Sequence, residues 1–541
     1  MTIHKRLTRR ATAWLSILLL LVGLLPLYAL ALYNHAFYDD FGFSLLTRDA
    51  WQTTHSIFGV VEAAVRNTVG IRQTWEGTYT TSFLSTFQPA LFGEGAYWVT
   101  TFLLLTVFML SVWFFLKQSL GGVYGMDRTA VFTAFGVLGF VLVQFVPDAA
   151  EAFFWFNGGV AYTLLWSVLL FAAGVWLKLE RARGGWRCTL LTLLLAVLMV
   201  LLGGAKYSTV LFAALLALSA TAWAFFKRRP KRWIDLLLTA LLLAGFAFSM
   251  AAPGNAVRAK TLSGGMSAPK AVLEAVYFGL ALLGHSFSLP LLAAMVLLVP
   301  LSIPALRRSG FAFGHPVWVT LLCVTLFCAQ LAPTLYTGNY LGDGRVLNTY
   351  HYALVLMLAQ VVLYWTGYFV RRTERGLSPV VGYDPFGLET PPLPTVADSG
   401  ALLTEGQTLP AAPEAPSPAA STRLEEGLKA ATLALVAGLL LVGCIAYHPD
   451  GAASYGPQNM AGGSALRAVL DGQAAAYDAA MDARDATLND SALQDVVLTP
   501  VPDAPAVFMG DALHSDNLEY VLNLYADYYD KATVRVADTG D

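Results

Sequence analysis

Charged residues are scarce in this chain of 541 residues. They make up 13% of it, whereas about a quarter of the residues in an average soluble domain are charged. The hydrophobic share of 56% and the mean hydropathy of +0.58 are correspondingly high. Long runs of Leu, Ala, Val and Phe alternate with short basic segments, which is the pattern of a protein that crosses a membrane many times. A soluble enzyme, a fibrous protein and a disulfide-rich secreted module are therefore excluded.

Cysteine and nucleotide-binding motifs are also scarce or missing. Four cysteines lie in or at the end of apolar runs, without a CxxC pair or a histidine partner, so neither a disulfide framework nor a zinc site is expected. The chain has no Walker-type glycine-rich loop, no HExxH and no GxSxG between a strand and a helix. This excludes an ATP-driven transporter in one chain, and any reaction outside the cell would need an activated, lipid-carried substrate. The cysteines are Cys188, Cys323, Cys328 and Cys444.

Apolar stretches long enough to span a bilayer, at about 17 to 25 residues each, recur along the chain. The sequence therefore predicts a membrane all-α fold with about eleven transmembrane helices. The predicted spans are 13–33, 96–116, 129–147, 160–178, 187–203, 207–226, 233–251, 286–304, 316–334, 350–370 and 427–446.

Basic residues predict the orientation, because Lys and Arg are enriched in loops on the cytoplasmic side. With the N-terminus inside, each predicted inner loop carries Lys or Arg, so we expect the C-terminal segment outside. The expected location is the bacterial cytoplasmic (inner) membrane. The expected domains are a transmembrane core of ten spans at 1–377 with a long outer loop at 34–95, a disordered Pro-rich cytoplasmic linker at 378–425, an eleventh span at 426–446 and an acidic extracytoplasmic domain at 447–541.

Two outer segments have internal patterns. Apolar residues in 56–69 recur at helical spacing, which suits a helix lying on the membrane surface. Residues 447–541 contain 15 Asp and Glu and 4 Lys and Arg, which leaves a net charge of −11. Their pattern predicts a small α/β domain that packs on loop 34–95. The predicted elements are helices at 464–488 and 517–529 and strands at 496–498, 506–509 and 533–536.

Ionisable residues gather at the outer ends of the predicted spans, where charges in a membrane protein are candidates for function. Asp39 and Asp40 follow the first span directly. A carboxylate in partly apolar surroundings keeps a raised proton affinity and can act as a general base. The alternative is an acidic pair that caps a helix, worth about 1 kcal/mol. A site at the outer surface fits this distribution better than a transport path at mid-membrane depth.

A second candidate region is the aromatic segment 149–162. Trp155 offers a ring that can stack on a sugar, and Glu151, Asn157 and Tyr162 can bind sugar hydroxyls. The alternative for the rings is an aromatic belt that anchors the fourth span at the interface. Glu151 and Asn157 are less well explained in that way.

Three outer cations are candidates for holding a lipid phosphate. Arg258 follows a Pro-Gly turn after the seventh span, Arg345 precedes the tenth, and Lys206 lies between the fifth and sixth. Arginine binds phosphate through two parallel hydrogen bonds. The alternative for each is a cation that reaches to the interface from the end of a helix.

Four motifs resemble the GT-C superfamily of integral membrane glycosyltransferases, and more closely an uncharacterised bacterial multispanning family grouped with it. The order of these motifs and the topology together carry the resemblance, which covers most of the chain except the Pro-rich linker. The motifs are Tyr38-Asp39-Asp40-Phe41, Phe154-Trp155-Phe156-Asn157-Gly158-Gly159, Ala252-Pro253-Gly254-Asn255-Ala256-Val257-Arg258 and Asn523-Leu524-Tyr525-Ala526-Asp527-Tyr528-Tyr529.

The resemblance implies transfer of a sugar from a polyprenyl-phosphate carrier to an acceptor on the outer face. It implies that Asp40 or Asp39 is the base, and it does not define a cofactor. A divalent metal stays open, because the acidic residue of the first loop helps to bind one in some branches. The missing Trp-Trp-Asp type motif argues against the oligosaccharyltransferase branch and its metal site, so no metal ligand is assigned. By position, Arg258, Arg345 and Lys206 would hold the donor phosphate.

The leading hypothesis is thus a glycosyltransferase whose partners are a polyprenyl-phosphate sugar, an envelope glycan, lipid or protein acceptor, and the bilayer, without nucleic acid. A polymerase or ligase of lipid-linked glycans is the first alternative, with arginines essential in place of the two aspartates. A non-enzymatic transporter or flippase, and a scaffold that recruits partners through its acidic tail, are the others.

Overall fold

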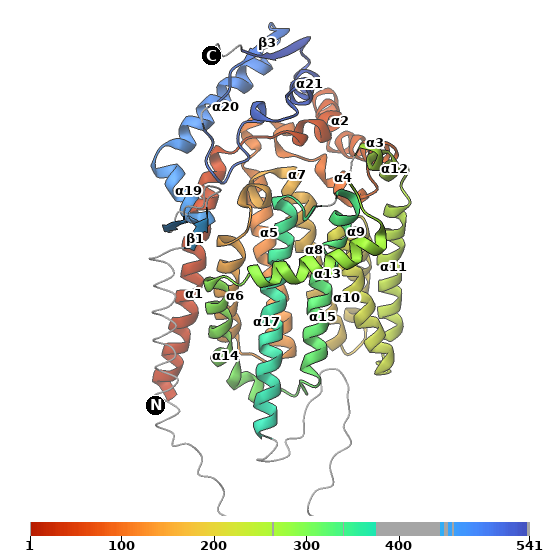
Figure 1. Ribbon diagram of the computed structural model, residues 1–541, viewed down its shortest axis with the longest axis vertical. Coiled ribbons are helices and arrows are strands. Elements are labelled where there is room, and N and C mark those ends of the chain that lie inside the picture. The colour runs from red at the N-terminus through yellow and green to blue at the C-terminus, as the bar shows by residue number, and fades with distance from the viewer. Residues whose placement is uncertain are drawn as a thin grey trace, which may run out of the picture.

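The computed structural model describes residues 2–261, 264–338, 340–374, 444–447, 453–456, 459–501 and 503–537. Helices dominate, and the long ones run side by side in one bundle (Figure 1). Among the described residues, nine helical stretches are long and apolar enough to cross a membrane. They contain α1 (Thr2–Leu30), α5 (Val99–Leu116), α8 (Leu165–Arg181), α9 (Trp186–Gly203), α10 (Tyr207–Phe226), α11 (Arg232–Met250), α14 (Leu289–Arg308), α15 (Pro316–Ala329) and α17 (Gly344–Glu374).

The membrane all-α class predicted from the sequence is confirmed. The predicted span 129–147 corresponds to α6 (Arg128–Gln144), an apolar helix of 17 residues that is shorter than each of the nine spanning stretches. The linker 378–425 and most of the eleventh span lie outside the described residues. Cys444–Tyr447, where that span was expected to end, forms the short strand β1.

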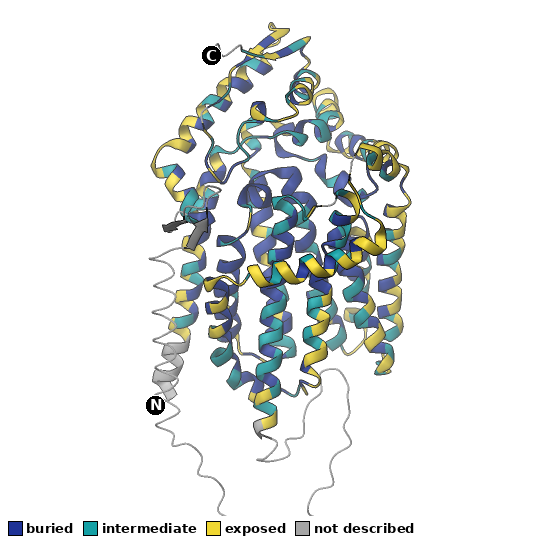
Figure 2. Ribbon diagram, in the orientation of Figure 1, coloured by how far each residue is buried: buried dark blue, intermediate teal, exposed yellow. Residues whose placement is uncertain are grey.

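Small residues let neighbouring helices approach closely. A Cβ atom added at Gly136 of α6 would lie 2.6 Å from the carbonyl oxygen of Ser16 on α1, so the two backbones are in direct contact. The opposite face of α1 exposes Leu18, Val22 and Leu25 (Figure 2). Exposed leucines and valines on a long helix suit contact with lipid chains.

One end of the bundle, here called the capped face, is covered by short helices that join the long ones. These helices arise from the long connection after α1, in line with the prediction that 34–95 contains no full span. Helix α3 exposes the apolar residues Ile57, Phe58, Val65 and Val69, so the helix expected at 56–69 is confirmed, and its position on the membrane surface stays a prediction. The helices are α2 (Asp39–Thr54), α3 (Ile57–Thr74), α4 (Tyr79–Ser85) and the 3₁₀-helices Pro89–Phe92 and Glu94–Ala96.

Later connections add further short helices. Helix α13 (Ala268–His285) lies across the bundle instead of along it and exposes one side strongly (Figures 1 and 2). The others are α7 (Phe156–Gly159), α12 (Pro253–Thr261) and α16 (Ala332–Gly338), with the π-helices Lys117–Val123, Ala150–Phe154 and Val160–Leu164. Two of these π-helices flank α7, and wide helical turns of this kind are frequent at functional sites.

The C-terminal segment forms helices and two short strand pairs, which lie beside α1 and over the capped face (Figure 1). The helix expected at 464–488 is divided by Gly472, whose φ of 77° only glycine adopts without strain. The helix near 517–529 and the strands near 496–498 and 533–536 are confirmed, and the two strands pair in parallel. The elements are α19 (Ala461–Leu470), α20 (Gln473–Asn489), α21 (Leu518–Tyr529), β1 (Cys444–Tyr447), β2 (Ala453–Gly456), β3 (Asp495–Leu498), β4 (Thr533–Val536) and the 3₁₀-helix Ala512–His514.

The strand predicted at 506–509 is wrong. The Phe508 N–H donates to the Pro505 carbonyl at 2.8 Å and closes a turn, so no strand partner is reached. The apolar run has another use, because the Phe508 ring packs against Phe154 and Tyr477. The apolar run at 506–509 therefore forms a turn whose Phe508 ring packs into the fold, instead of a strand.

The C-terminal segment packs directly on the first connection, as expected. Phe41 of α2 lies 5.0 to 6.0 Å from the rings of Tyr525, Tyr528 and Tyr529 on α21. Arg48 of α2 also donates to the Tyr528 carbonyl and lies over its ring. This aromatic contact holds the segment over the start of α2, where the two aspartates lie.

Candidate functional site

The aspartate pair begins α2, immediately after the turn that follows α1. The Asp40 N–H donates to the Phe37 carbonyl at 3.0 Å, and the Phe37 N–H donates back to the Asp40 carboxylate at 3.1 Å. These two hydrogen bonds close the turn that leads into the first turn of α2. Tyr38 between them has a φ of 49°. The turn is therefore tightly defined, and it gives the two neighbouring carboxyl groups different surroundings.

Asp40 is fully buried and joins three parts of the fold. Its carboxylate accepts hydrogen bonds from the Asn157 N–H at 3.0 Å, from the Asn157 side-chain amide at 2.9 Å and from the Tyr97 hydroxyl. Burial raises the pKa of Asp40 to about 7, against the lowering effect of these donors. Asp40 thus links α2 to α7 and to the start of the second predicted span, and its lone pairs are already engaged.

Asp39 has the opposite environment. It is half-buried, and none of the described residues donates a hydrogen bond to its carboxylate. Burial raises its pKa, while the positive charges of Arg345, Lys206 and Arg258 act in the other direction. Its negative charge also raises the pKa of Tyr520 on α21, after burial. Asp39 is therefore within the electrostatic influence of a group of cations, and its own charge acts on the C-terminal segment.

Glu76 organises two of these cations. Its carboxylate is buried and accepts from the Lys206 ammonium at 2.7 Å on both oxygens, from Arg258 at 2.6 Å and from the Thr78 hydroxyl at 2.8 Å. Burial raises the pKa of Glu76, but the charges of Lys206 and Arg258 outweigh it, so the pKa lies below its usual value. The guanidinium of Arg258 also lies over the Trp75 ring. Glu76 therefore fixes the positions of both cations.

Close backbone packing explains why Glu76 lies there. A Cβ atom added at Gly77 would lie 1.8 Å from the Ser249 carbonyl oxygen at the end of α11, and one at Gly254 would lie 2.6 Å from the Trp75 nitrogen. Asn255 accepts from the Gly77 N–H at 3.1 Å and from the Tyr207 hydroxyl at 2.9 Å. The Pro-Gly-Asn part of the predicted motif thus serves to seat the loop that carries Glu76.

The third cation, Arg345, is held by its own acids. It donates to Glu151 at 2.7 Å through the guanidinium and also through its backbone N–H, and it pairs with Asp343. Glu151 lies on the π-helix Ala150–Phe154, and burial raises its pKa although Arg345 lowers it. The guanidinium lies 5.2 Å from the centre of the Trp155 ring. Arg345 is therefore fixed in position from several sides.

The charged cluster is defined as four acids and three bases on the capped face. Its two halves interact, because the charge of Arg345 acts on Lys206 and that of Arg258 acts on Asp39. Formally it carries one net negative charge. Its members are Asp39, Glu76, Glu151, Asp343, Lys206, Arg258 and Arg345.

Most of the residues predicted from the sequence meet here. Trp155 stacks under Arg345 and donates its indole N–H to the Phe37 carbonyl at 3.2 Å, and Tyr162 lies beside Arg345. Asp40 and Asn157 are not part of the charged cluster. They are buried, and Asn157 donates hydrogen bonds to the Asp40 carboxylate. Contact of Asn157 with a sugar stays a prediction, and within this structure its amide positions Asp40.

Sequence reasoning did not identify Glu76 or Tyr97. A signal for Glu76 was present: three interfacial cations at one level require countercharges, and Glu76 is an acid in the long connection between α1 and α5. Tyr97 gave no such signal, because a tyrosine at the end of a span is usual.

A separate group in the described residues has donor atoms suited to a metal ion. His35 and two aspartates of α20 offer atoms within 4.8 Å of one another. The imidazole lies 2.9 Å from Asp478 and 4.0 Å from Asp482, and it also contacts Asp485 at 3.3 Å. Because the imidazole is hydrogen-bonded to carboxylates on both sides, the geometry is explained without a metal.

Comparison with family models finds no match to this chain, and no curated protein matches it. The chemistry of the charged cluster is therefore the basis for assigning a function.

Proposed function

We propose that the protein is a glycosyltransferase that moves a sugar from a polyprenyl-phosphate donor to a hydroxyl group of a cell-envelope acceptor, with Asp39 as general base. The observation that supports this most is the environment of Asp39, which is half-buried, has no hydrogen-bond donor among the described residues and is within the electrostatic influence of Arg345, Lys206 and Arg258. A base and a set of phosphate-binding groups are the two components that such a transfer requires.

The proposed reaction is a single displacement at the anomeric carbon. Asp39 takes the proton of the acceptor hydroxyl as its oxygen forms the new bond to that carbon. The bond from the carbon to the phosphate oxygen breaks, and its electron pair leaves with the polyprenyl phosphate. Lys206, Arg258 and Arg345 stabilise the charge that develops on this leaving group. The raised pKa of Asp39 suits a base that must hold a proton briefly.

Asp39 is preferred to Asp40 because a base needs a free lone pair directed at its substrate. Asp40 already accepts from Phe37, Tyr97 and Asn157, and its side chain is inaccessible. In this proposal Asp40 is a positioning residue that fixes the turn from which Asp39 projects.

The acids in the charged cluster limit how phosphate can bind. Each cation is already paired, so a phosphate must bind N–H groups of these cations that do not donate to the carboxylates. Arg258 is 38% exposed and bonds Glu76 through only one guanidinium nitrogen. We therefore infer that Arg258 makes the main phosphate contact, and that Glu76 and Glu151 orient the cations for it.

The experiment is transfer of labelled sugar from a panel of polyprenyl-phosphate sugars to extracted envelope acceptors, using purified protein in membranes. Asp39→Asn is expected to lower the rate at least about 100-fold. The matched control is Asp49→Asn, an exposed aspartate on the same helix, which is expected to retain full activity.

Two outcomes separate the alternatives. Full transfer by Asp39→Asn together with loss of transfer in Arg258→Ala would contradict the base assignment and favour a polymerase or ligase centred on the arginines. Movement of a labelled lipid across the membrane without a new glycosidic bond would favour a flippase.

A further inference from the structure

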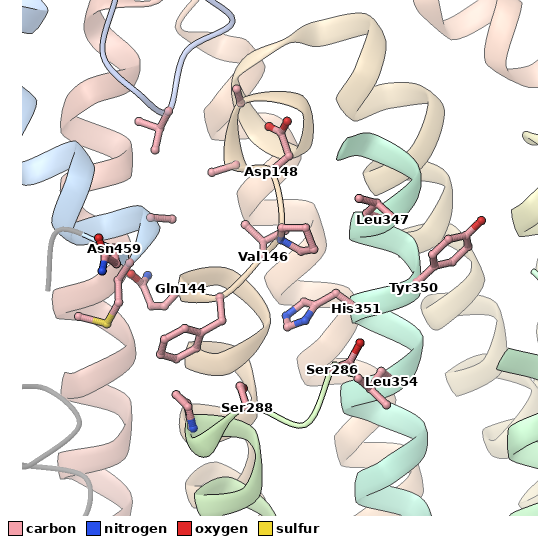
Figure 3. A pocket seen from close by; sticks show the side chains of 18 of the residues that line it. Gln144, Val146, Asp148, Ser286, Ser288, Leu347, Tyr350, His351, Leu354 and Asn459 are labelled. Carbon is pink, nitrogen blue, oxygen red and sulfur yellow. The ribbon is translucent and has the colours of Figure 1, made fainter. Parts of the chain in front are cut away.

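A cavity lies beside the charged cluster, between the bundle and the C-terminal segment. Its volume of about 770 Å³ falls in the range of cavities that hold small molecules. Figure 3 shows the end of α6 on one side and α17 on the other, with Gln144, Asp148, Leu347 and His351 on its walls. Residues 459–464 and 506–509 of the C-terminal segment complete the lining.

This cavity differs in charge from the charged cluster. Neither lysine nor arginine lines it in the described part of the chain, and Asp148 is its one carboxylate there. Phosphate is therefore disfavoured, because no cation is present to balance its charge. The residues Pro147–Ala150 line the cavity, and the next residue, Glu151, binds Arg345. The two sites are thus adjacent and chemically distinct.

The lining has an apolar part and a polar part. Phe145, Leu291, Phe327, Leu354 and Phe508 provide aromatic and aliphatic surface. Apart from Asp148, the polar part is neutral in composition, and it comes from the end of α13 and the connection to α14, from α17, and from the C-terminal segment. It includes His285, Ser286, Ser288, Tyr350, His351, Asn459 and Ser464.

His285 has a defined role in the polar part. Its Nδ1 lies 2.8 Å from the Ala281 carbonyl, so this nitrogen carries the proton and donates. Nε2 is then left as an acceptor for a hydroxyl group. Ser288 accepts from the Leu291 N–H at 3.4 Å, and its own hydroxyl proton is available to a ligand. The cavity can therefore accept a hydrogen bond from a ligand hydroxyl group at His285 and donate one at Ser288, and neither contact needs a formal charge.

Helix α13 links this cavity to the lipid phase. It exposes the apolar residues Val272, Leu273, Val276 and Leu280, and Tyr277 beside them. Because α13 lies across the bundle, this exposed side suits the headgroup level of a bilayer (Figure 2). His285 ends the helix and lines the cavity. A lipid lying along α13 would thus meet the cavity with its head group.

The wall formed by the C-terminal segment is built firmly. The Gly462 N–H donates to the Gln144 amide oxygen at 2.8 Å, and the Gln144 nitrogen donates to the Gly23 carbonyl at 3.0 Å. A Cβ atom added at Gly462 would lie 2.3 Å from that same carbonyl oxygen. Helix α19 is therefore fixed against α1 and α6.

We propose that this cavity is a binding site for an uncharged lipid with a hydroxylated head group, of neutral glycolipid chemistry. The hydroxyl groups contact His285, Ser288 and Ser464, and the hydrocarbon contacts the phenylalanines and leucines. The inference goes beyond glycosyl transfer and does not require it, because a lipid bound here need not react.

The experiment uses the full chain in lipid nanodiscs and two photoreactive probes with the same chains. One probe is a diacylglycerol hexoside and the other is a phosphatidic acid, and labelled peptides are mapped by mass spectrometry. The hexoside is expected to label 282–291, 459–464 or 506–509 at least about three times as strongly as the phosphatidic acid, the ratio expected for one lost hydrogen bond. Equal labelling of these segments by both probes would overturn the proposal.

Two variants test the position of the lipid. Ser464→Trp fills the cavity from α19 and is expected to abolish hexoside labelling, whereas Leu470→Trp at an exposed position of the same helix is the control and keeps it. His285→Leu removes the Nε2 acceptor, together with the Nδ1–H bond to the Ala281 carbonyl, and is expected to lower labelling about threefold. Unchanged labelling in Ser464→Trp and His285→Leu would contradict the site, and sugar-transfer activity plays no part in either readout.

Discussion

Asp39 and Asp40 are neighbours in sequence, yet their carboxyl groups perform different tasks. The turn before α2 buries one and leaves the other half-buried, under the influence of three positive charges. Asp40→Asn places an amide against donors from Tyr97 and Asn157, so we expect it to lower the free energy of unfolding by about 2 kcal/mol. Asp39→Asn is expected to change it by less than about 0.5 kcal/mol. Thermal unfolding in nanodiscs measures both, and equal destabilisation would contradict the separation of roles.

Asp40 also gives a pH dependence with a definite sign. Its pKa rises from about 3.9 in an unfolded chain to about 7 in the folded protein. The contribution of this raised pKa to the free energy of unfolding is complete at low pH, and it is lost as the pH rises through about 7. Stability is therefore expected to fall between about pH 4 and pH 7. The free energy of unfolding should depend less on pH in Asp40→Asn, and its pH dependence should be unchanged in Asp49→Asn.

Glu76 is a second residue whose charge has a testable consequence. Glu76→Gln leaves Lys206 and Arg258 without their countercharge, and loss of one partner of a buried ion pair costs about 3 kcal/mol. If these cations bind phosphate, inorganic pyrophosphate should raise the unfolding midpoint more in this variant than in the wild type. Glu62→Gln, at an exposed position of α3, is the control. A variant as stable as the wild type would exclude Glu76 as the organising carboxylate.

At the scale of residues, sequence reasoning found the candidates but not their partners. Lys206, Arg258, Arg345 and Asp39 were selected because charge at a membrane interface is conspicuous. Glu76 was missed because its role depends on the packing of Gly77 against α11 and of Gly254 against Trp75, which brings distant segments together. Composition and spacing carry no information about such contacts.

Elements with strong apolar periodicity were predictable, and short ones were less so. The long helices and α21 follow directly from their side-chain patterns. The division of α19 from α20 depends on one glycine with positive φ, and the turn at 506–509 depends on Pro505. Helix α13 was not predicted, since it lies across the bundle and has both an exposed and a buried face.

The contact between α20 and the connection after α1 should respond to pH. Burial lowers the pKa of His35, but hydrogen bonds to Asp485 and Asp478 outweigh it, so the pKa is raised. Asp482 and the Tyr477 ring also face the imidazole. The stabilising effect is complete below about pH 6.5 and is lost as the pH rises through the raised pKa.

Hydrogen exchange of α20 measures this loss. Protection of Gln473–Asn489, corrected for the intrinsic rate, is expected to decrease between about pH 6 and pH 8. His35→Gln should remove the pH dependence, and His55→Gln, at an exposed position before α3, should keep it. Protection that is independent of pH in the wild type would refute the role of His35.

For the whole molecule, the arrangement of helices determines which groups share a face. Helices α1 and α9 both end on the capped face. At the end of α9, the Gly204 carbonyl accepts hydrogen bonds from the Thr80 and Thr81 N–H groups of α4 at 3.1 and 3.2 Å. Helix α8 starts next to α7 and runs for 17 residues, or about 25 Å, to the opposite end. The charged cluster and the C-terminal segment therefore lie on one side, and the basic connection around Arg183 lies on the other.

This separation makes the orientation testable in a single experiment. In a variant without Cys188, Cys323, Cys328 and Cys444, Leu470→Cys on α19 and Arg183→Cys after α8 place single thiols at exposed positions of opposite ends. A membrane-impermeant maleimide should label Leu470→Cys in intact cells, and Arg183→Cys only after permeabilisation, because basic loops stay in the cytoplasm. The reverse result would put Asp39 and the three cations on the cytoplasmic side. Transfer to an envelope acceptor outside the cell would then be impossible from this site, and the proposed function would have to be abandoned.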